Sequence, residues 1–175
     1  MKKNLIFKLC FTAVMSGLFV VLDLVSIKLG NQLKITVSGL PIILVALLFG
    51  PIYGCVSGLL GAFIGQLLSY GLSATTVLWI LPAGIRGLLV GLVFLAFSKS
   101  DKYIYILINI IISSLAVTAA NTLVLYIDSN IYGYYNPLTF LSDAGVRVVS
   151  SIITALALSI VTLPVYKAIK KQFKN

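Results

Sequence analysis

Long apolar segments separated by short polar ones make up most of the chain. A helix needs roughly 20 apolar residues to cross a bilayer, at a rise of about 1.5 Å per residue. The apolar runs predict six helices, the second and third of them short, with a break at Gly50–Pro51. The predicted helices cover residues 5–27, 40–54, 56–72, 77–98, 103–127 and 140–169. We therefore expect an all-α integral membrane protein, a six-helix bundle in which residues 1–175 form a single transmembrane domain.

The composition supports this interpretation. Hydrophobic residues make up 60% of the chain and charged residues 10%, far from the composition of a soluble domain. The first apolar run follows Lys2, Lys3 and Lys8, as in a signal peptide. It is too long for a typical signal core, however, and no small-residue cleavage site precedes Asp23. We expect this run to be retained as the first helix.

The lysines predict the orientation of the helices. With six crossings both termini lie on one side, and that side carries nine lysines against two, Lys28 and Lys34, on the other. The positive-inside rule then places the N- and C-termini in the cytoplasm. The net charge of +9 is mainly this topology signal, together with attraction to anionic lipid headgroups. No basic stretch alternates with aromatic residues for base stacking, so no nucleic-acid partner is predicted.

Polar residues within the helices gather toward one side of the membrane. Asp23, Gln66, Asn121 and Arg147 fall in the outer halves of their helices and Arg86 near the middle, whereas the inner halves are almost wholly apolar. An ion pathway needs polar groups across the full thickness of the membrane. The pattern therefore favours a ligand-binding cup open to the outside over a channel.

The two arginines have a structural and a functional interpretation. A cation in hydrocarbon costs about 2.5–3.5 kcal/mol on insertion scales, so it faces a partner or a polar cavity. Arg147 has a local partner in Asp143, one helical turn earlier, and Arg86 could be neutralised by Asp23 or by carbonyl groups at a helix end. Alternatively, each guanidinium binds a carboxylate or phosphate of a ligand. Because its own helix offers no partner, Arg86 is the better candidate for ligand contact.

The remaining candidate residues also have two interpretations. Loop residues are either lid contacts or solvated, aromatic residues either stack on a ligand or form an interfacial belt, and the amides either line the cup or join helices. The predicted substrate-binding residues are Arg86, Arg147, Asn121, Lys34, Asn31, Gln66, Trp79, Tyr70 and Tyr132.

Catalytic chemistry has little support in the sequence. The chain has no histidine and no glutamate, which leaves four aspartates as conventional acid–base groups. It has no nucleotide-binding loop, nucleophile elbow or zinc motif. Cys10 and Cys55 are not spaced as metal ligands, so packing explains both. We expect no enzyme activity, no cofactor and no metal.

Small residues recur at helical spacing and mark faces where helix backbones can approach closely. Such pairs occur at Gly54/Gly58, Gly61/Gly65, Gly87/Gly91 and, on the first helix, Ala13/Gly17. Most such faces serve internal packing. The first helix could remain peripheral, so Ala13 and Gly17 are candidate partner-docking residues.

Several of these segments resemble one family. Residues 34–51, which end in Phe49–Gly50–Pro51, and residues 54–61 are similar to the second-helix region of the substrate-binding S components of energy-coupling factor (ECF) vitamin transporters. Ala13 and Gly17 match the AxxxA docking motif of that family, with glycine in place of the second alanine.

The resemblance implies a bacterial plasma-membrane protein that captures a vitamin from outside. It implies a transmembrane T subunit and two ATPase subunits as partners, and a protein that topples in the lipid bilayer to release its substrate inward. The second-helix region is most similar to the folate-type branch, although residues 66–71 and 81–87 depart from the folate pattern. Riboflavin, pantothenate, a pyridoxine-like compound or cobalamin are alternative substrates, and a stand-alone carrier is an alternative function.

Overall fold

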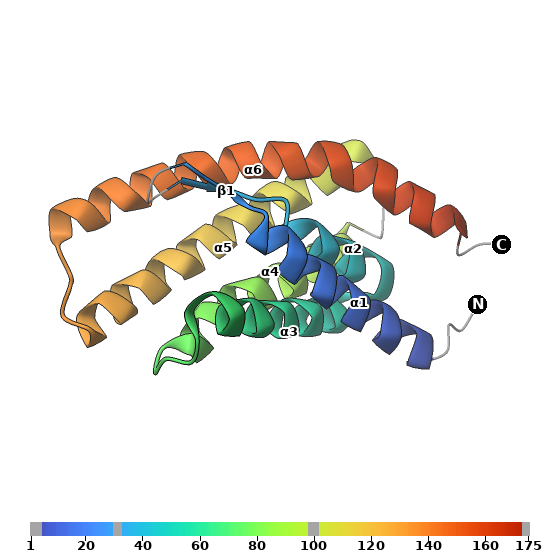
Figure 1. Ribbon diagram of the computed structural model, residues 1–175. Helices are drawn as coiled ribbons and strands as arrows, with labels where there is room; N and C mark the ends of the chain where they lie inside the picture. Colours follow the sequence, from blue (N-terminus) through green and yellow to red (C-terminus); the bar gives the residue numbers. More distant parts are fainter. Residues whose placement is uncertain (1–4, 30–32, 98–101, 173–175) are drawn as a thin grey trace.

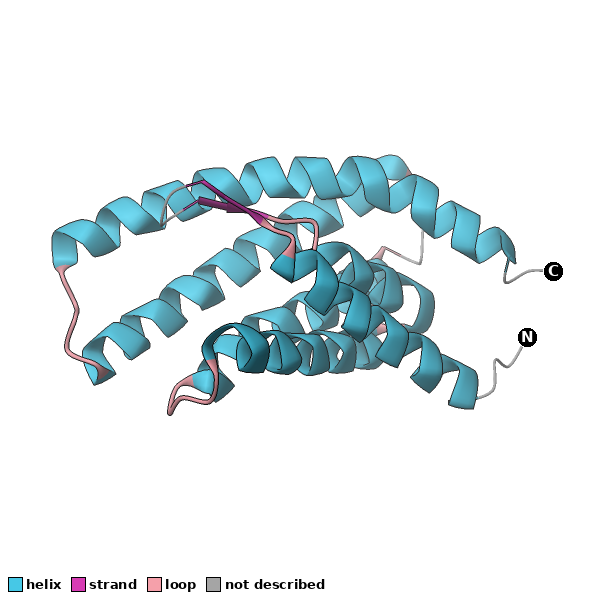
Figure 2. Ribbon diagram, in the orientation of Figure 1, coloured by secondary structure: helices cyan, strands magenta, loops and turns pink. Residues whose placement is uncertain are grey.

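The described residues form a bundle of six helices with one short hairpin (Figures 1 and 2). The computed structural model describes residues 5–29, 33–97 and 102–172, and for 27–29 and 33–35 it describes the backbone alone. The elements are α1 (Leu5–Leu24), β1 (Ile27–Leu29), β2 (Leu33–Ile35), α2 (Gly39–Phe49), α3 (Pro51–Tyr70), α4 (Thr76–Ala96), α5 (Tyr103–Ile131) and α6 (Pro137–Gln172).

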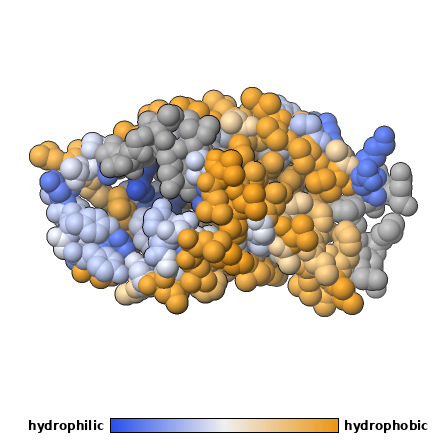
Figure 3. All heavy atoms as spheres, viewed as in Figure 1, coloured by the Kyte–Doolittle hydropathy of each residue, from blue (hydrophilic) through white to orange (hydrophobic). Residues whose placement is uncertain are grey.

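Five of the described helices are long and apolar enough to cross a membrane, and α2, with 11 residues, is shorter. Figure 1 shows both chain ends at one end of the molecule. The opposite end, which we call the rim, carries the α3–α4 connection (71–75), the α5–α6 connection (132–136) and the helix ends beside them. Figure 3 shows hydrophilic residues gathered at the rim and hydrophobic residues over most of the remaining visible surface.

Helix α2 forms the centre of the core. Its side chains from Ile42 to Leu47 are all buried, and it contacts α1, α3, α4 and α6. A helix that is hydrophobic all round is one enclosed by others. Gly50, with φ of 98°, ends α2, and Pro51 begins α3 at once, because the first turn of a helix tolerates the missing N–H of proline.

Glycines bring α3 and α4 together. A Cβ at Gly58 would lie 2.2 Å from the carbonyl oxygen of Ala83, and one at Gly87 would lie 2.1 Å from the carbonyl group of Gly54. No side chain fits at such distances, so these glycines serve internal packing, as small residues do between membrane helices. The resulting α3–α4 pair is a close-packed support for the residues that α4 carries.

The fold differs from the sequence prediction at several helix boundaries. Helix α3 runs over the full range Pro51–Tyr70, whereas we expected a short helix over 56–72 and a second helix that continued to 54. Helix α1 ends at Leu24, three residues earlier than expected, and Ile27 instead begins an antiparallel hairpin in which it lies opposite Ile35. Helix α5 continues to Ile131, and α6 already begins at Pro137.

Candidate functional site

A cavity of about 630 Å³ lies between the helices in the rim half of the protein. All six helices and residues 36 and 38 contribute to its wall. Its size falls in the range of small-molecule sites, which are clefts of roughly 300–1,000 Å³. The polar and aromatic lining residues are Phe19, Asp23, Thr36, Ser38, Gln66, Ser69, Tyr70, Trp79, Arg86, Ser114, Thr118, Asn121, Arg147, Ser150, Ser151 and Thr154.

The structure brings six of the nine predicted binding residues to this one cavity: Arg86, Arg147, Asn121, Gln66, Trp79 and Tyr70. The other three are not placed there. Asn31 lies outside the described residues, only the backbone of Lys34 is described, and Tyr132 is an exposed residue that follows α5. Whether any of the nine contacts a ligand stays a prediction.

Arg86 projects from the middle of α4 toward the start of α2. Its guanidinium lies so close to Gly39 that a Cβ there would be 2.0 Å from Nη1. The Asp23 carboxylate attracts the Arg86 guanidinium electrostatically. Asp23 also accepts a hydrogen bond from the Ser38 hydroxyl at 3.1 Å. The Nε of Arg86 is nevertheless buried and has no acceptor among the described residues. A buried donor without a partner is costly, so this group has capacity for a ligand acceptor.

Arg147 lies on the opposite wall, on α6. Asp143 and Tyr134 attract it electrostatically, which agrees in part with the local pairing considered from the sequence. No hydrogen bond joins the two side chains, however, and Oδ1 of Asp143 is buried without a hydrogen-bond partner in the described part of the chain. The Asp143 charge therefore balances Arg147 without occupying its donors, and these remain able to bind a ligand.

Sequence reasoning missed one residue that contacts the site. Asp128, expected in an outer loop, lies in the last turn of α5 and is only 8% exposed. The indole Nε1 of Trp79 donates to its Oδ1 at 3.2 Å, and the Tyr134 hydroxyl donates to Oδ2. Partial burial and the Asp128 carboxylate raise the pKa of Tyr134 to about 12. Gly133 was the signal in the sequence that could have placed Asp128 within α5. A glycine commonly follows the last turn of a helix, and Gly133 lies beyond Asp128.

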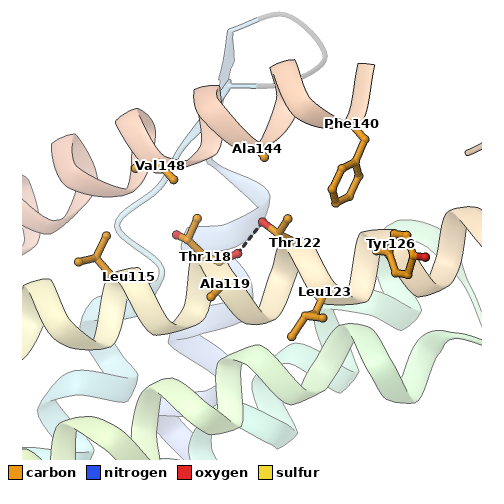
Figure 4. A pocket seen from close by; sticks show the side chains of 9 residues that line it. All are labelled: Leu115, Thr118, Ala119, Thr122, Leu123, Tyr126, Phe140, Ala144 and Val148. Atoms are coloured by element: carbon orange, nitrogen blue, oxygen red, sulfur yellow. Dashed lines mark hydrogen bonds between the residues drawn. The ribbon is translucent and has the colours of Figure 1, made fainter. Parts of the chain in front are cut away.

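A second, apolar groove of about 470 Å³ lies between α5 and α6 (Figure 4). The only polar atoms of its wall side chains belong to Thr118, Thr122 and Tyr126. The Thr122 hydroxyl donates to the carbonyl oxygen of Thr118 at 2.8 Å, and the Thr118 hydroxyl donates to that of Ser114 at 2.9 Å. Because both threonine hydroxyls are satisfied within α5, the groove offers far fewer orienting polar groups than the larger cavity. We place the candidate site in the larger cavity.

Comparison with known proteins agrees with this geometry. A family model described as "ECF-type riboflavin transporter, S component" matches residues 3–171. The chain belongs to this family. It is thus a subunit of a vitamin transporter and a multi-pass protein of the bacterial cell membrane, and it is not an enzyme. The match does not confirm the folate-type branch.

Two solved structures share the fold of this S component. One, described as the S component of a bacterial ECF transporter, is 18% identical with a TM-score of 0.70, over 98% of this chain and 100% of that one. The other, ThiT from Listeria monocytogenes, is 18% identical with a TM-score of 0.74, over 96% and 97%. A comparison with curated proteins gives no match.

The small-residue face of α1 is open in this S component. Ala13 and Gly17 are exposed, and a Cβ at Gly17 would meet no atom within 4 Å. The opposite side of α1 contacts α3, where the Ser16 hydroxyl lies 3.2 Å from the carbonyl oxygen of Ser57. Five of the six glycines in the α3 and α4 pairs pack closely against another helix, and the sixth, Gly65, lines the cavity. The α1 pair, in contrast, is exposed.

Proposed function

We propose that this S component captures a vitamin from outside in the cavity that contains Arg86, Arg147 and Trp79. The observation that carries the proposal is the cavity itself, because polar and aromatic side chains from five helices and from residues 36 and 38 converge on one space of ligand size. Such convergence in a mostly apolar protein is typical of a small-molecule site.

Charge narrows the class of substrate. The described wall carries two arginines and one aspartate, Asp23, so a neutral or anionic ligand is favoured over a cation. Riboflavin, the substrate in the family's description, is neutral, and its flat ring system offers carbonyl acceptors and a stacking face. We propose riboflavin as the first substrate to test.

Folate is the second candidate, and the two arginines favour it. Its glutamyl group carries two carboxylates, each of which a guanidinium binds bidentately. The two substrates predict different behaviour. Folate binding should weaken steeply with salt because it depends on full charges, whereas riboflavin binding should change little.

Equilibrium binding by the purified chain tests the proposal. Riboflavin and folate are titrated at low and high salt, with the cationic vitamin thiamine as a control. We expect one of the first two to bind and thiamine to fail. Arg86→Gln removes the charge and should weaken binding about 10- to 150-fold, the value of a hydrogen bond to a charged group. Equal affinity in wild type and Arg86→Gln, or no binding of any vitamin, contradicts the proposal.

We further propose that the exposed face of α1 docks on the transmembrane T subunit and that two ATPase subunits drive release. Close helix approach depends on small side chains, so Gly17→Leu should prevent co-purification with these partners while leaving vitamin affinity unchanged. Gly145→Leu is the matched control, because Gly145 is also exposed on a helix and a Cβ there meets no atom within 4 Å. Co-purification equal to wild type in Gly17→Leu contradicts docking at this face. Vitamin flux in liposomes with the chain alone would instead indicate a stand-alone carrier.

The lysine distribution supports a cytoplasmic location for both termini, with the rim outside. A membrane-impermeant thiol reagent tests this orientation in a Cys10→Ser, Cys55→Ser background that carries Asn175→Cys. Labelling is expected only after the cells are opened. Labelling in intact cells would instead indicate that the C-terminus lies outside, which contradicts the proposed orientation.

A further inference from the structure

Asp128 is a buried carboxylate that three separate segments hold at the rim. Trp79 of α4 donates its indole N–H to Oδ1 at 3.2 Å, the Tyr134 hydroxyl of the α5–α6 connection donates to Oδ2, and the side chain of Thr75, which precedes α4, is also hydrogen-bonded to the carboxylate. A buried carboxylate is costly unless its oxygens accept hydrogen bonds. With three donors, Asp128 ties the start of α4 to the end of α5.

The end of α5 is shaped to make this contact. Gly133 adopts the left-handed conformation, with φ of 75°, and the backbone N–H of Tyr134 donates to the carbonyl oxygen of Ser129 at 3.0 Å. This is the hydrogen bond of a Schellman turn, in which a glycine ends the helix and reverses the chain. The reversal returns Tyr134 to the last turn of α5, where its hydroxyl reaches Asp128.

Trp79 links this carboxylate to the ligand cavity. Its ring lies in the cavity wall, and its single N–H, the only donor of an indole, is committed to Asp128. One hydrogen bond at the ring edge restricts rotation of the whole ring. A stacking partner that is already ordered avoids the ordering cost that binding otherwise incurs.

We propose that Asp128 is a positioning residue that holds the Trp79 ring in the cavity wall as a preformed stacking surface for a flat heteroaromatic ligand. The inference rests on the proposed function of the cavity. Asp128 contacts no ligand itself and acts through Trp79. Ordering one side chain corresponds to about 2- to 12-fold in affinity, which is the loss expected in Asp128→Ala.

The first test needs no ligand. Trp79 is the only tryptophan of the chain, so its emission spectrum and its quenching by a water-soluble quencher report on this one ring. Asp128→Ala should shift the emission to longer wavelength and increase quenching, and Asp128→Asn, which keeps an acceptor oxygen, should restore most of the wild-type signal. Asn130→Ala is the matched control, because Asn130 lies in the same turn and bonds to the carbonyl oxygen of Tyr126 instead.

The second test measures affinity by calorimetry for the vitamin that wild type binds. Trp79→Phe keeps an aromatic ring but removes the donor, so Asp128→Ala should cost about 2- to 12-fold in the wild-type background and nothing further in Trp79→Phe. The inference is overturned if Asp128→Ala lowers affinity by the same factor in the Trp79→Phe background as in wild type. It is also overturned if Asp128→Ala leaves the Trp79 spectrum unchanged. If Asp128→Ala does not fold, Tyr134→Phe removes one of the three donors and should give a smaller shift of the same sign. Failure of wild type to bind any vitamin refutes the proposed function alone, since the ligand-free spectra still decide whether Asp128 positions Trp79.

Discussion

The contact between Gly39 and Arg86 provides a way to move a cavity charge without removing it. A Cβ at Gly39 would lie 2.0 Å from Nη1 of Arg86, and ordinary contacts begin at 3.4 Å. In Gly39→Ala the guanidinium must therefore move by about 1.4 Å. Because it is the far end of a flexible side chain, the movement is possible without a change of fold.

The size of the effect follows from hydrogen-bond geometry. Charge-assisted hydrogen bonds span about 2.7–2.9 Å, so a displacement of this size breaks a bond between Arg86 and a ligand. A hydrogen bond to a charged group contributes about 1.5–3 kcal/mol, which is roughly a 10- to 150-fold loss of vitamin affinity. Stability should change little, because only the far end of a flexible side chain has to move and the backbone at Gly39 can stay in place.

Calorimetric titration with the vitamin, together with thermal unfolding in detergent, measures both quantities. Gly145→Ala is the control, since a Cβ there meets no atom within 4 Å, and its affinity should equal that of wild type. In an Arg86→Gln background, Gly39→Ala should have no further effect because the displaced group is gone. If Arg86→Gln weakens binding but Gly39→Ala does not, or if the two losses multiply, Gly39 does not act through Arg86 and the reasoning is wrong.

Three further predictions concern stability and pH. Gly87→Ala should destabilise the protein by about 1–3 kcal/mol or more in thermal unfolding, since its Cβ would lie 2.1 Å from the backbone of Gly54; a melting temperature equal to that of Gly145→Ala contradicts this. Gly133→Ala should cost about 1–2 kcal/mol, because a residue with a side chain is disfavoured in the left-handed conformation; unchanged thermal stability would argue against the turn. The pKa of Tyr134 is raised from 10.0 to about 12, so its contribution to stability is complete below pH 10 and is lost as the pH rises through about 12. Unfolding midpoints measured across that pH window should fall more in wild type than in Tyr134→Phe, and parallel curves would contradict the assignment.

The sequence predicted the helical membrane fold and several polar residues of the cavity wall for a simple physical reason. Polar side chains are so costly within a membrane that their positions alone indicate a shared polar space. Arg86, Arg147, Asn121 and Gln66 come from four different helices, and the structure brings all four to one cavity. The small pairs of α3 and α4 were likewise predicted as packing faces, and the pair of α1 was set apart because the first helix could remain peripheral.

Contacts that depend on chain reversal could not be predicted in this way. The hairpin of β1 and β2 has only three residues per strand, and its apolar residues merge with the pattern of α1. The end of α5 was placed at 127 because the apolar run stops there, yet the helix continues because Asp128 finds donors from α4 and from the α5–α6 connection. Trp79, one of these donors, is 49 residues away from Asp128 in the sequence. Only the assembled fold therefore shows that the helix can continue through this polar residue.

Helix α4 combines part of the candidate site with the rigid core of this S component. Trp79, Ala83 and Arg86 recur at helical spacing and line the cavity, so they share one face. Gly84, Gly87 and Gly91 are shifted along the chain and face α3, where any Cβ would lie within 2.8 Å of α3 atoms. The ligand-facing stripe is therefore fixed by an adjacent stripe that permits almost no movement, whereas the opposite wall, on α6, is not held to α4 by contacts of this kind. We therefore expect any movement of the cavity wall to occur at α6 and Arg147 rather than at α4 and Arg86.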